Sequence, residues 1–192
     1  PVRLWSAGLG FDRIGHNRLG KLDGREADLL ARLELAKRVD PDRLRQVTGL
    51  VNSPRWPLAS GAGRLFEAAG ALLCSATHND WEGEAAARCE ALAAGCQADI
   101  DRWPEIELEP AEVPTLPSSD LLVEAARRLV DGESPDRVAL GVHRTFCALA
   151  VELTTRVAAD HRGVVALGGG CLVNRLLLEG LTTGLEREGF EV

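Results

Sequence analysis

Residues 164–181 read VVALGGGCLVNRLLLEGL, and this stretch decides the fold. The short apolar, β-branched run over 164–167 predicts a buried strand, and the three glycines at 168–170 predict a turn. The leucine-rich segment over about 172–188 predicts a helix, after which residues 190–192 begin another strand. Strand, glycine turn, helix and strand in this order indicate an α/β unit with a parallel sheet.

The glycine turn is also a candidate ligand site. Glycines between a strand and a helix let the backbone approach a ligand, and the N-terminus of the following helix favours anions such as phosphate or adenylate. Asn174 lies near the start of that helix, where it could hydrogen-bond a sugar or a base. The pattern matches neither G-x-G-x-x-G nor G-x-x-x-x-G-K-[ST], so a plain structural turn remains the alternative.

Helices are predicted upstream of this unit. Ser134-Pro135 places an N-cap and an N1 proline at the start of a long helix that runs to about residue 160. Ser60 is a plausible N-cap for a helix over about 61–73. Further helices are predicted over residues 26–38, 82–94 and 118–130, the last ended by Asp131-Gly132.

The remaining segments predict extended or irregular structure. Residues 1–22 have short apolar runs separated by glycine, which is typical of strands and turns. Residues 99–117 contain four prolines and many acidic residues, and predict a connector with one short strand over 106–108.

Composition excludes several classes of protein. The net charge is -7, which argues against broad binding of a nucleic-acid backbone, and no apolar run is long enough to span a membrane. The five cysteines form no C-x-x-C pair, so a zinc site has no support and reduced thiols in a cytoplasmic protein are expected. The chain contains no Met, even at position 1, and is therefore expected to be a fragment.

Several blocks resemble one enzyme family. Residues 60–73, SGAGRLFEAAGALL, resemble S-S-x-G-R-L-F-D-A-V-A-A-L-L of the HypF-type hydrogenase-maturation carbamoyltransferases. Residues 81–86 resemble that family's Y-E-G-Q-A-A, residues 142–145 its F-H-x-T, and residues 167–177 its L-S-G-G-V-F-Q-N-R-L-L. The start of the chain, with Trp5 and a later FDRIGH block, is also similar. The tRNA threonylcarbamoyl transferases form the second choice, because they have Lys where this chain has Ala68.

The resemblance implies a fold and a division of the chain. The fold would be α/β, an ASKHA (actin-like, RNase H-like) lobe with helical insertions that is incomplete at both ends. Residues 1–50 would be the end of the first lobe and a helical connector. Residues 51–192 would be the nucleotide-binding second lobe, truncated before its last strands.

The resemblance also implies a reaction. A carbamoyl group would pass from carbamoyl adenylate, made elsewhere from carbamoyl phosphate and ATP, to the C-terminal cysteine of the partner protein HypE. The product would serve the maturation of a nickel–iron hydrogenase. A nucleotide-binding module without activity and a tRNA-modifying protein are the alternatives.

Site residues follow from the same blocks. The resemblance assigns nucleotide binding to Ser60, Gly63, Glu67, Gly168, Gly169, Gly170 and Asn174. The glycines would approach the phosphate, Asn174 the nucleoside and Glu67 the ribose hydroxyls. Arg64 and His143 are the catalytic candidates. Arg64 would bind phosphate or form a structural salt bridge, whereas His143 would orient a substrate or be a satisfied core histidine.

The chain departs from the family pattern at several polar positions. Glu67 stands for Asp, Gly61 and Gly168 each stand for Ser, and Val173 stands for Gln. The family's metal-binding H-x-x-x-H pair has no counterpart here, so the ligands of the metal ion are expected outside this chain. The chain alone is therefore predicted to have no metal site and little or no turnover.

Overall fold

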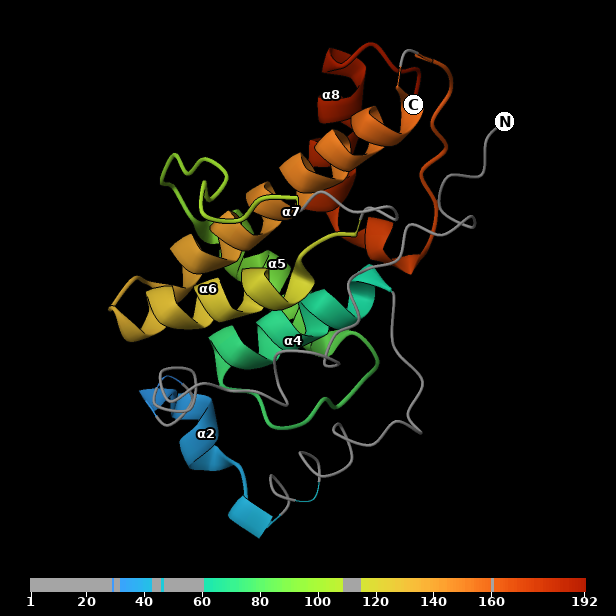
Figure 1. Cartoon of the computed structure of the whole chain (residues 1–192). Coiled ribbons are helices and arrows are strands. Elements are labelled where there is room, and N and C mark those ends of the chain that lie inside the picture. Colours follow the sequence, from blue (N-terminus) through green and yellow to red (C-terminus); the bar gives the residue numbers. More distant parts are fainter. Residues whose placement is uncertain (1–28, 30–31, 43–45, 47–60, 109–114, 160) are drawn as a thin grey trace.

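Helices dominate the part of the chain that the computed structural model describes, which is residues 29, 32–42, 46, 61–108, 115–159 and 161–192. The elements are α2 (Glu34–Arg38), α4 (Ala62–Cys74), α5 (Glu84–Gly95), α6 (Ser118–Val130), α7 (Pro135–Ala158), the 3-10 helix η2 (Gly170–Val173) and α8 (Arg175–Arg187). Figure 1 shows the long α7 running through the molecule, with α4, α5 and α6 around one half of it and α8 beside the other.

The predicted helix ends are confirmed where local signals are strong. Ser134 is the N-cap of α7 and Pro135 occupies its first turn. Gly132 has φ 91° and donates to the carbonyl of Leu129, which ends α6 as expected for a glycine after a helix. The predicted N-cap of α4 is wrong by one residue, because the cap is Gly61. Ser60 itself lies outside the described residues.

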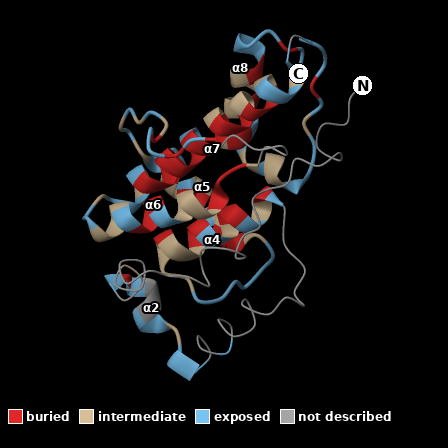
Figure 2. Ribbon diagram, viewed as in Figure 1, coloured by how far each residue is buried: buried red, intermediate tan, exposed pale blue. Residues whose placement is uncertain are grey.

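The core is arranged around α7. Its buried apolar side chains follow helical spacing: Val138, Val142, Phe146, Leu149 and Leu153. Phe66 of α4, Leu121 of α6 and Leu177 of α8 belong to the same buried cluster. Figure 2 shows this burial continuing from α7 into α4 and α5. Fully burying each such side chain contributes about 1.5–3 kcal/mol, so α7 organises the fold.

Small residues let the helices approach closely. A Cβ placed on Gly70 of α4 would lie 1.8 Å from the carbonyl oxygen of Ala85 at the start of α5. A Cβ on Gly184 of α8 would lie 2.7 Å from Cγ2 of Val151 on α7. These distances are far below van der Waals contact, so both helix pairs depend on the absence of a side chain.

The connector before α6 is held by tertiary contacts. A Cβ on Gly141 would lie 2.4 Å from Nε1 of Trp103, so the Trp103 ring lies directly against the backbone of α7. The backbone N–H of Trp103 donates to Oγ1 of Thr145 at 2.9 Å, and the guanidinium of Arg128 lies 4.7 Å from the ring centroid. The predicted strand over 106–108 is wrong: the segment is irregular, because anchoring of Trp103 outweighs local strand propensity.

The predicted parallel pairing is confirmed in direction but not in extent. Val164 and Glu191 form an isolated parallel bridge. The N–H of Val165 donates to the carbonyl of Glu191 at 2.7 Å, and the N–H of Glu191 donates to the carbonyl of Gly163 at 3.2 Å. Among the described residues this bridge stands in place of the two strands expected, so the unit keeps its α/β connection with little sheet. The strands predicted over 1–22 lie outside the described residues.

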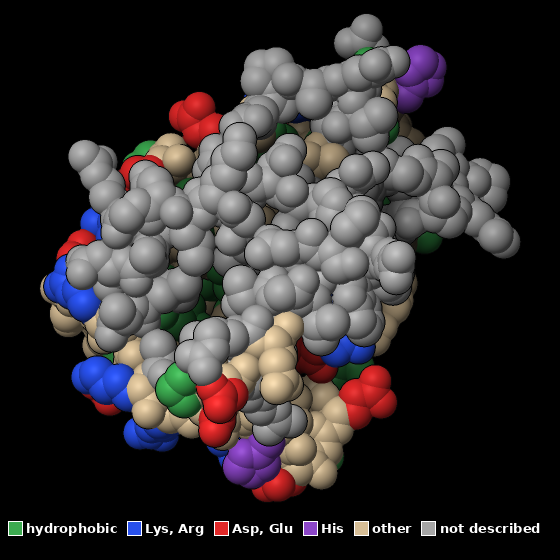
Figure 3. All heavy atoms as spheres, turned by 60° about the horizontal axis from the view of Figure 1, so that its bottom comes forward, with side chains coloured by type: hydrophobic (Ala, Val, Ile, Leu, Met, Phe, Trp, Pro, Cys, Tyr) green, Lys and Arg blue, Asp and Glu red, His purple; other side chains and the backbone are tan. Residues whose placement is uncertain are grey.

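In Figure 3, the side chains of described residues that are visible around the edge of the face shown include Lys or Arg next to Asp or Glu. Within the described ranges, none of the helices has the length and apolar character needed to cross a membrane.

Replacing Gly70 by Ala should destabilise the fold by about 3 kcal/mol, because the added Cβ would force the backbones of α4 and α5 apart. Gly95→Ala is the matched control, since a Cβ at Gly95 meets nothing within 4 Å and alanine favours the helix. Urea-induced unfolding measures both free energies. Equal stability of the two variants would contradict the close approach.

Candidate functional site

The glycine loop adopts a conformation that requires glycine. Gly169 has φ 111° and ψ 161°, a region that side-chain-bearing residues rarely adopt. Gly168, Gly169 and Gly170 are exposed, and a Cβ on any of them would meet open space. None of the three donates a backbone hydrogen bond to another described residue. Within the described part of the chain, these N–H groups are therefore without a backbone acceptor.

The N-terminus of α8, in contrast, is already engaged. Oδ1 of Asn174, the N-cap, accepts a hydrogen bond from the N–H of Leu177 at 3.1 Å. Oε1 of Glu90, from α5, accepts one from the N–H of Arg175 at 2.7 Å. A capping amide and a carboxylate of the protein itself thus satisfy donors that the sequence suggested were free for an anion. The candidate donors for a ligand, among the described residues, are therefore mainly those of the glycine loop.

His143 links the middle of α7 to this N-cap. The side chain is 2% exposed. Nδ1 lies 2.8 Å from the carbonyl oxygen of Ala139, and Nε2 lies 2.9 Å from Nδ2 of Asn174. A carbonyl only accepts, so we assign the hydrogen to Nδ1 and leave Nε2 as the acceptor of the Asn174 amide. Phe66 of α4 covers the imidazole with a centroid separation of 4.8 Å.

Burial keeps His143 neutral. Loss of solvation lowers the pKa of its imidazole to about 4, partly opposed by the hydrogen bond to Ala139. Near pH 7 the ring therefore carries no charge, and a direct role as a proton donor is not favoured. The geometry is that of a satisfied core histidine, and it joins three helices.

Arg64 and Glu67 form a salt bridge on the first turns of α4. Nη1 of Arg64 lies 2.6 Å from Oε2 of Glu67, with side-chain exposures of 66% and 22%. This is the structural alternative expected for Arg64. An exposed pair of this kind contributes at most about 1 kcal/mol, so either side chain can be released toward a ligand at low cost.

Gly63 brings the start of α4 to the glycine loop. A Cβ there would lie 3.4 Å from Sγ of Cys171, the second residue of η2. Burial raises the pKa of the Cys171 thiol, while the backbone N–H of Gly63 acts to lower it. Gly63, the loop and Asn174 therefore lie in one region, joined to His143.

Two contacts in this region, made by Glu90 and Cys171, could not be predicted from the sequence pattern. Glu90 lies on a predicted helix, but its contact is with a backbone N–H 85 positions along the chain. Cys171 follows the glycines, yet its contact with Gly63 joins two distant blocks of sequence. Only tertiary structure brings either pair together.

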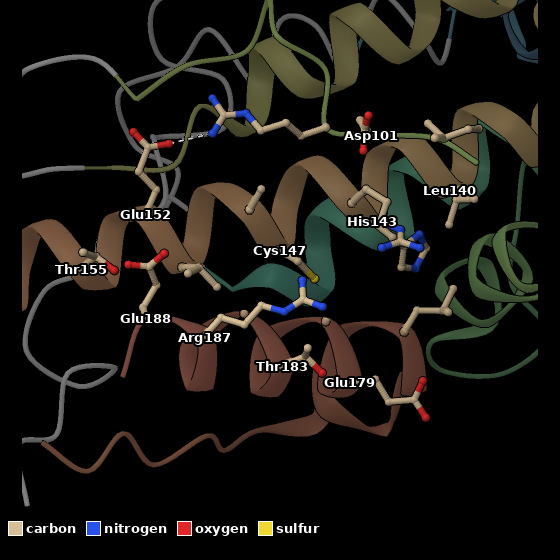
Figure 4. Close-up of a pocket in the computed structure, with 18 of the residues that line it drawn as sticks. Asp101, Leu140, His143, Cys147, Glu152, Thr155, Glu179, Thr183, Arg187 and Glu188 are labelled. Atoms are coloured by element: carbon tan, nitrogen blue, oxygen red, sulfur yellow. Dashed lines mark hydrogen bonds and ion pairs between the residues drawn. The ribbon is translucent and has the colours of Figure 1, made fainter. Parts of the chain in front are cut away.

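A groove of about 860 Å³ runs between α7 and α8 (Figure 4). His143 and Cys147 line it from α7, Arg187 lines it from α8, and the Arg102–Glu152 ion pair of 2.8 Å borders it. Burial raises the pKa of Cys147 to about 12, so this thiol is not an activated nucleophile. The groove therefore contains no activated thiol. The N–H donors of the glycine loop are the stronger candidate for binding a ligand.

No group of three or more His, Cys, Asp or Glu side chains that could hold a metal ion occurs among the residues described by the structure. The location of metal ligands outside this chain stays a prediction.

Comparison with known proteins identifies one family. Residues 14–192 match the family described as the carbamoyltransferase Kae1-like domain, second subdomain. The chain is 37% identical over 123 residues to carbamoyltransferase HypF of Rhodobacter capsulatus, covering 63% of this chain and 15% of that protein. It is 33% identical over 168 residues to carbamoyltransferase HypF of Rhizobium leguminosarum bv. viciae, covering 83% of this chain and 21% of that protein.

Solved structures show the same likeness at the level of the fold. A full-length HypF, crystallised in a phosphate- and nucleotide-bound form, matches 88% of this chain with TM-score 0.74 and 22% identity. The HypF of T. kodakarensis matches 87% with TM-score 0.70 and 20% identity. In both cases this chain spans 22% of the solved chain.

The lowered pKa of His143 predicts a pH-dependent stability. In the unfolded chain the imidazole takes up a proton below its ordinary pKa of 6.5, whereas the folded protein resists protonation until about pH 4. The stabilisation is therefore complete above pH 6.5 and is lost as pH falls toward 4, by an amount on the order of 3 kcal/mol. Urea unfolding at pH 7, 6 and 5 measures it.

His143→Phe is the control for this experiment, because phenylalanine keeps the contact with Phe66 and cannot titrate. The wild-type curve should fall more steeply between pH 6.5 and 4 than the curve of the variant. Parallel curves would show that His143 is solvated or charged in the folded protein.

Proposed function

Since the chain belongs to the HypF carbamoyltransferase family, in which it corresponds to the second subdomain of the Kae1-like domain, we propose that it binds the adenylate during carbamoyl transfer. In this proposal carbamoyl adenylate, made from carbamoyl phosphate and ATP, gives its carbamoyl group to the C-terminal cysteine of HypE. The step serves maturation of a nickel–iron hydrogenase in the cytoplasm. The chain spans about a fifth of the length of its relatives, so this activity is that of a longer protein.

The observation that carries the proposal is the set of open N–H groups on the glycine loop. Gly168, Gly169 and Gly170 offer donors without a partner among the described residues, in a conformation fixed by the positive φ of Gly169. Preorganised backbone donors stabilise charge that develops on a phosphate when a thiolate attacks the attached carbonyl. A full-length HypF of the same fold was crystallised with phosphate and nucleotide bound, which supports nucleotide binding by the longer protein.

Asn174 is assigned to the nucleoside. It uses one Nδ2 hydrogen for His143 and one Oδ1 lone pair for Leu177, so one hydrogen and one lone pair remain. Glu67 is assigned to the ribose hydroxyls. Binding them would break its salt bridge with Arg64, and the Arg64 guanidinium could then bind the phosphate. Ser60 belongs to the same assignment and lies outside the described residues.

The proposed organisation places residues 51–192 in the nucleotide-binding lobe and residues 1–50 in the end of the preceding lobe. The metal ion and the remaining half of the cleft would come from other parts of the longer protein. The isolated chain should therefore bind nucleotide without turning over.

A nucleotide-binding module without transfer activity is the second candidate. Val173 is 86% exposed beside the loop where the family has Gln, and Gly168 stands where the family has Ser. Both changes remove polar groups next to the loop, which would cost catalysis more than binding. Transfer to a HypE C-terminal peptide by the longer protein separates the two candidates.

Isothermal titration of AMP and ATP into the chain tests nucleotide binding, which both candidate functions require. We expect binding that Asn174→Ala and Glu67→Ala each weaken by about 1–3 kcal/mol, the scale for losing a hydrogen bond to a buried partner. Glu186→Ala, on the exposed last turn of α8, is the control and should bind as the wild type does. Absence of wild-type binding would leave the glycine loop a structural turn.

A further inference from the structure

We infer that His143 is a positioning residue, which fixes the orientation of the Asn174 side-chain amide at the exit of the glycine loop and thereby sets what Asn174 presents to a ligand. The inference rests on the proposed nucleotide site and adds a residue that does not itself touch the ligand.

The donor and the acceptor of each hydrogen bond are fixed from Ala139 through His143 to Asn174. The carbonyl of Ala139 can only accept, so it holds the hydrogen of His143 on Nδ1, 2.8 Å away. Nε2 then has only a lone pair, and the group 2.9 Å away must be the amino side of the Asn174 amide. The carbonyl side, Oδ1, is thereby directed to the N–H of Leu177 at 3.1 Å.

The same hydrogen bonds exclude the reversed orientation of the Asn174 side-chain amide. Turning the Asn174 amide over would place Oδ1 against the Nε2 lone pair and Nδ2 against the Leu177 N–H, so two hydrogen bonds would become two repulsive contacts. The N-cap bond from the Leu177 N–H already requires Oδ1 on that side, and His143 adds a second requirement by holding the Nδ2 side. His143 therefore strengthens the orientation of the Asn174 amide and uses one of its two Nδ2 hydrogens, which leaves the other hydrogen and one lone pair for a ligand.

The surroundings of His143 suit an indirect role. Phe66 covers the ring from α4, Ala139 holds it from within α7, and Asn174 meets it at the start of α8. No charged side chain of a described residue forms a hydrogen bond or an ion pair with it. The ring is 2% exposed, so a ligand at the loop meets Asn174 and not His143.

Asn174 also transmits this constraint to the loop. Its backbone N–H donates to the carbonyl of Cys171, and the N–H of Leu172 donates to the carbonyl of Gly169. The short η2 turn therefore connects the glycines directly to the capped end of α8. Fixing Asn174 fixes both the cap and the exit of the loop.

A double-mutant cycle on AMP affinity, measured by calorimetry with the whole chain, tests the inference. His143→Phe keeps the contact with Phe66 and removes the acceptor, while Asn174→Ser keeps a capping oxygen and removes the amide. Each should weaken AMP binding roughly tenfold, and the double variant should be no weaker than either single variant. His143→Gln, whose carbonyl can accept from Asn174, should recover part of the affinity.

Nitrogen-15 NMR of the imidazole gives an independent signature. In the wild type we expect a hydrogen on Nδ1 and an unprotonated Nε2 throughout pH 6–8, and Asn174→Ser should shift the Nε2 resonance. The exposed His161 supplies a reference imidazole signal in the same spectrum.

The outcomes separate the two proposals. Wild-type affinity in His143→Phe, or additive losses in the double variant, would overturn the positioning role while leaving the nucleotide site intact. If the wild type binds no AMP, the proposed nucleotide site is wrong and the positioning role fails with it. If in that case the Nε2 resonance still shifts in Asn174→Ser, the His143–Asn174 hydrogen bond exists and is purely structural.

Discussion

The hydrogen bond between His143 and Asn174 is the polar contact that ties together helices already packed through the apolar core. It connects the middle of α7, which organises the core, to the first residue before α8, which follows the glycine loop. Phe66 covers the same imidazole from α4. Because an unpaired polar group at 2% exposure would be costly, the pair holds α4, α7 and α8 in one arrangement. Because Asn174 is the N-cap of α8 and directly follows η2, the same pair also anchors the end of the glycine loop.

This contact also gives a physical reason for the spacing of the family blocks. Phe66 belongs to the block at 60–73, His143 to the block at 142–145 and Asn174 to the block at 167–177. The three residues meet around one imidazole although more than a hundred positions separate the first from the last. A family that keeps one of these blocks has a structural reason to keep the others, since losing any one leaves a buried partner unsatisfied or uncovered.

The sequence predicted the features that depend on neighbouring residues. Ser134 and Pro135 begin α7, Gly132 ends α6 and the glycines form an exposed turn, because capping and positive φ are local properties. The sequence did not predict features that depend on distant residues. Trp103 packs on Gly141 and residues 106–108 are irregular, and the parallel pairing is limited to a bridge. Glu90 of α5 accepts a hydrogen bond from the first N–H of α8, and nothing in the sequence of α5 indicates this contact.

Glu90 bears on how a nucleotide would lie over the loop. Its carboxylate already sits 2.7 Å from the N–H of Arg175, where the positive end of α8 would otherwise attract a phosphate. Two like charges about 4 Å apart repel by roughly 1 kcal/mol in water and by up to about 4 kcal/mol near a protein surface. A phosphate would therefore favour the open N–H groups of Gly168 and Gly169, away from Glu90, and the uncharged nucleoside would favour the side of Asn174. Under the proposed function, the carboxylate at this helix end would therefore discriminate between the two ends of the ligand. The glycine loop and the Asn174 amide would then bind one adenylate in one direction.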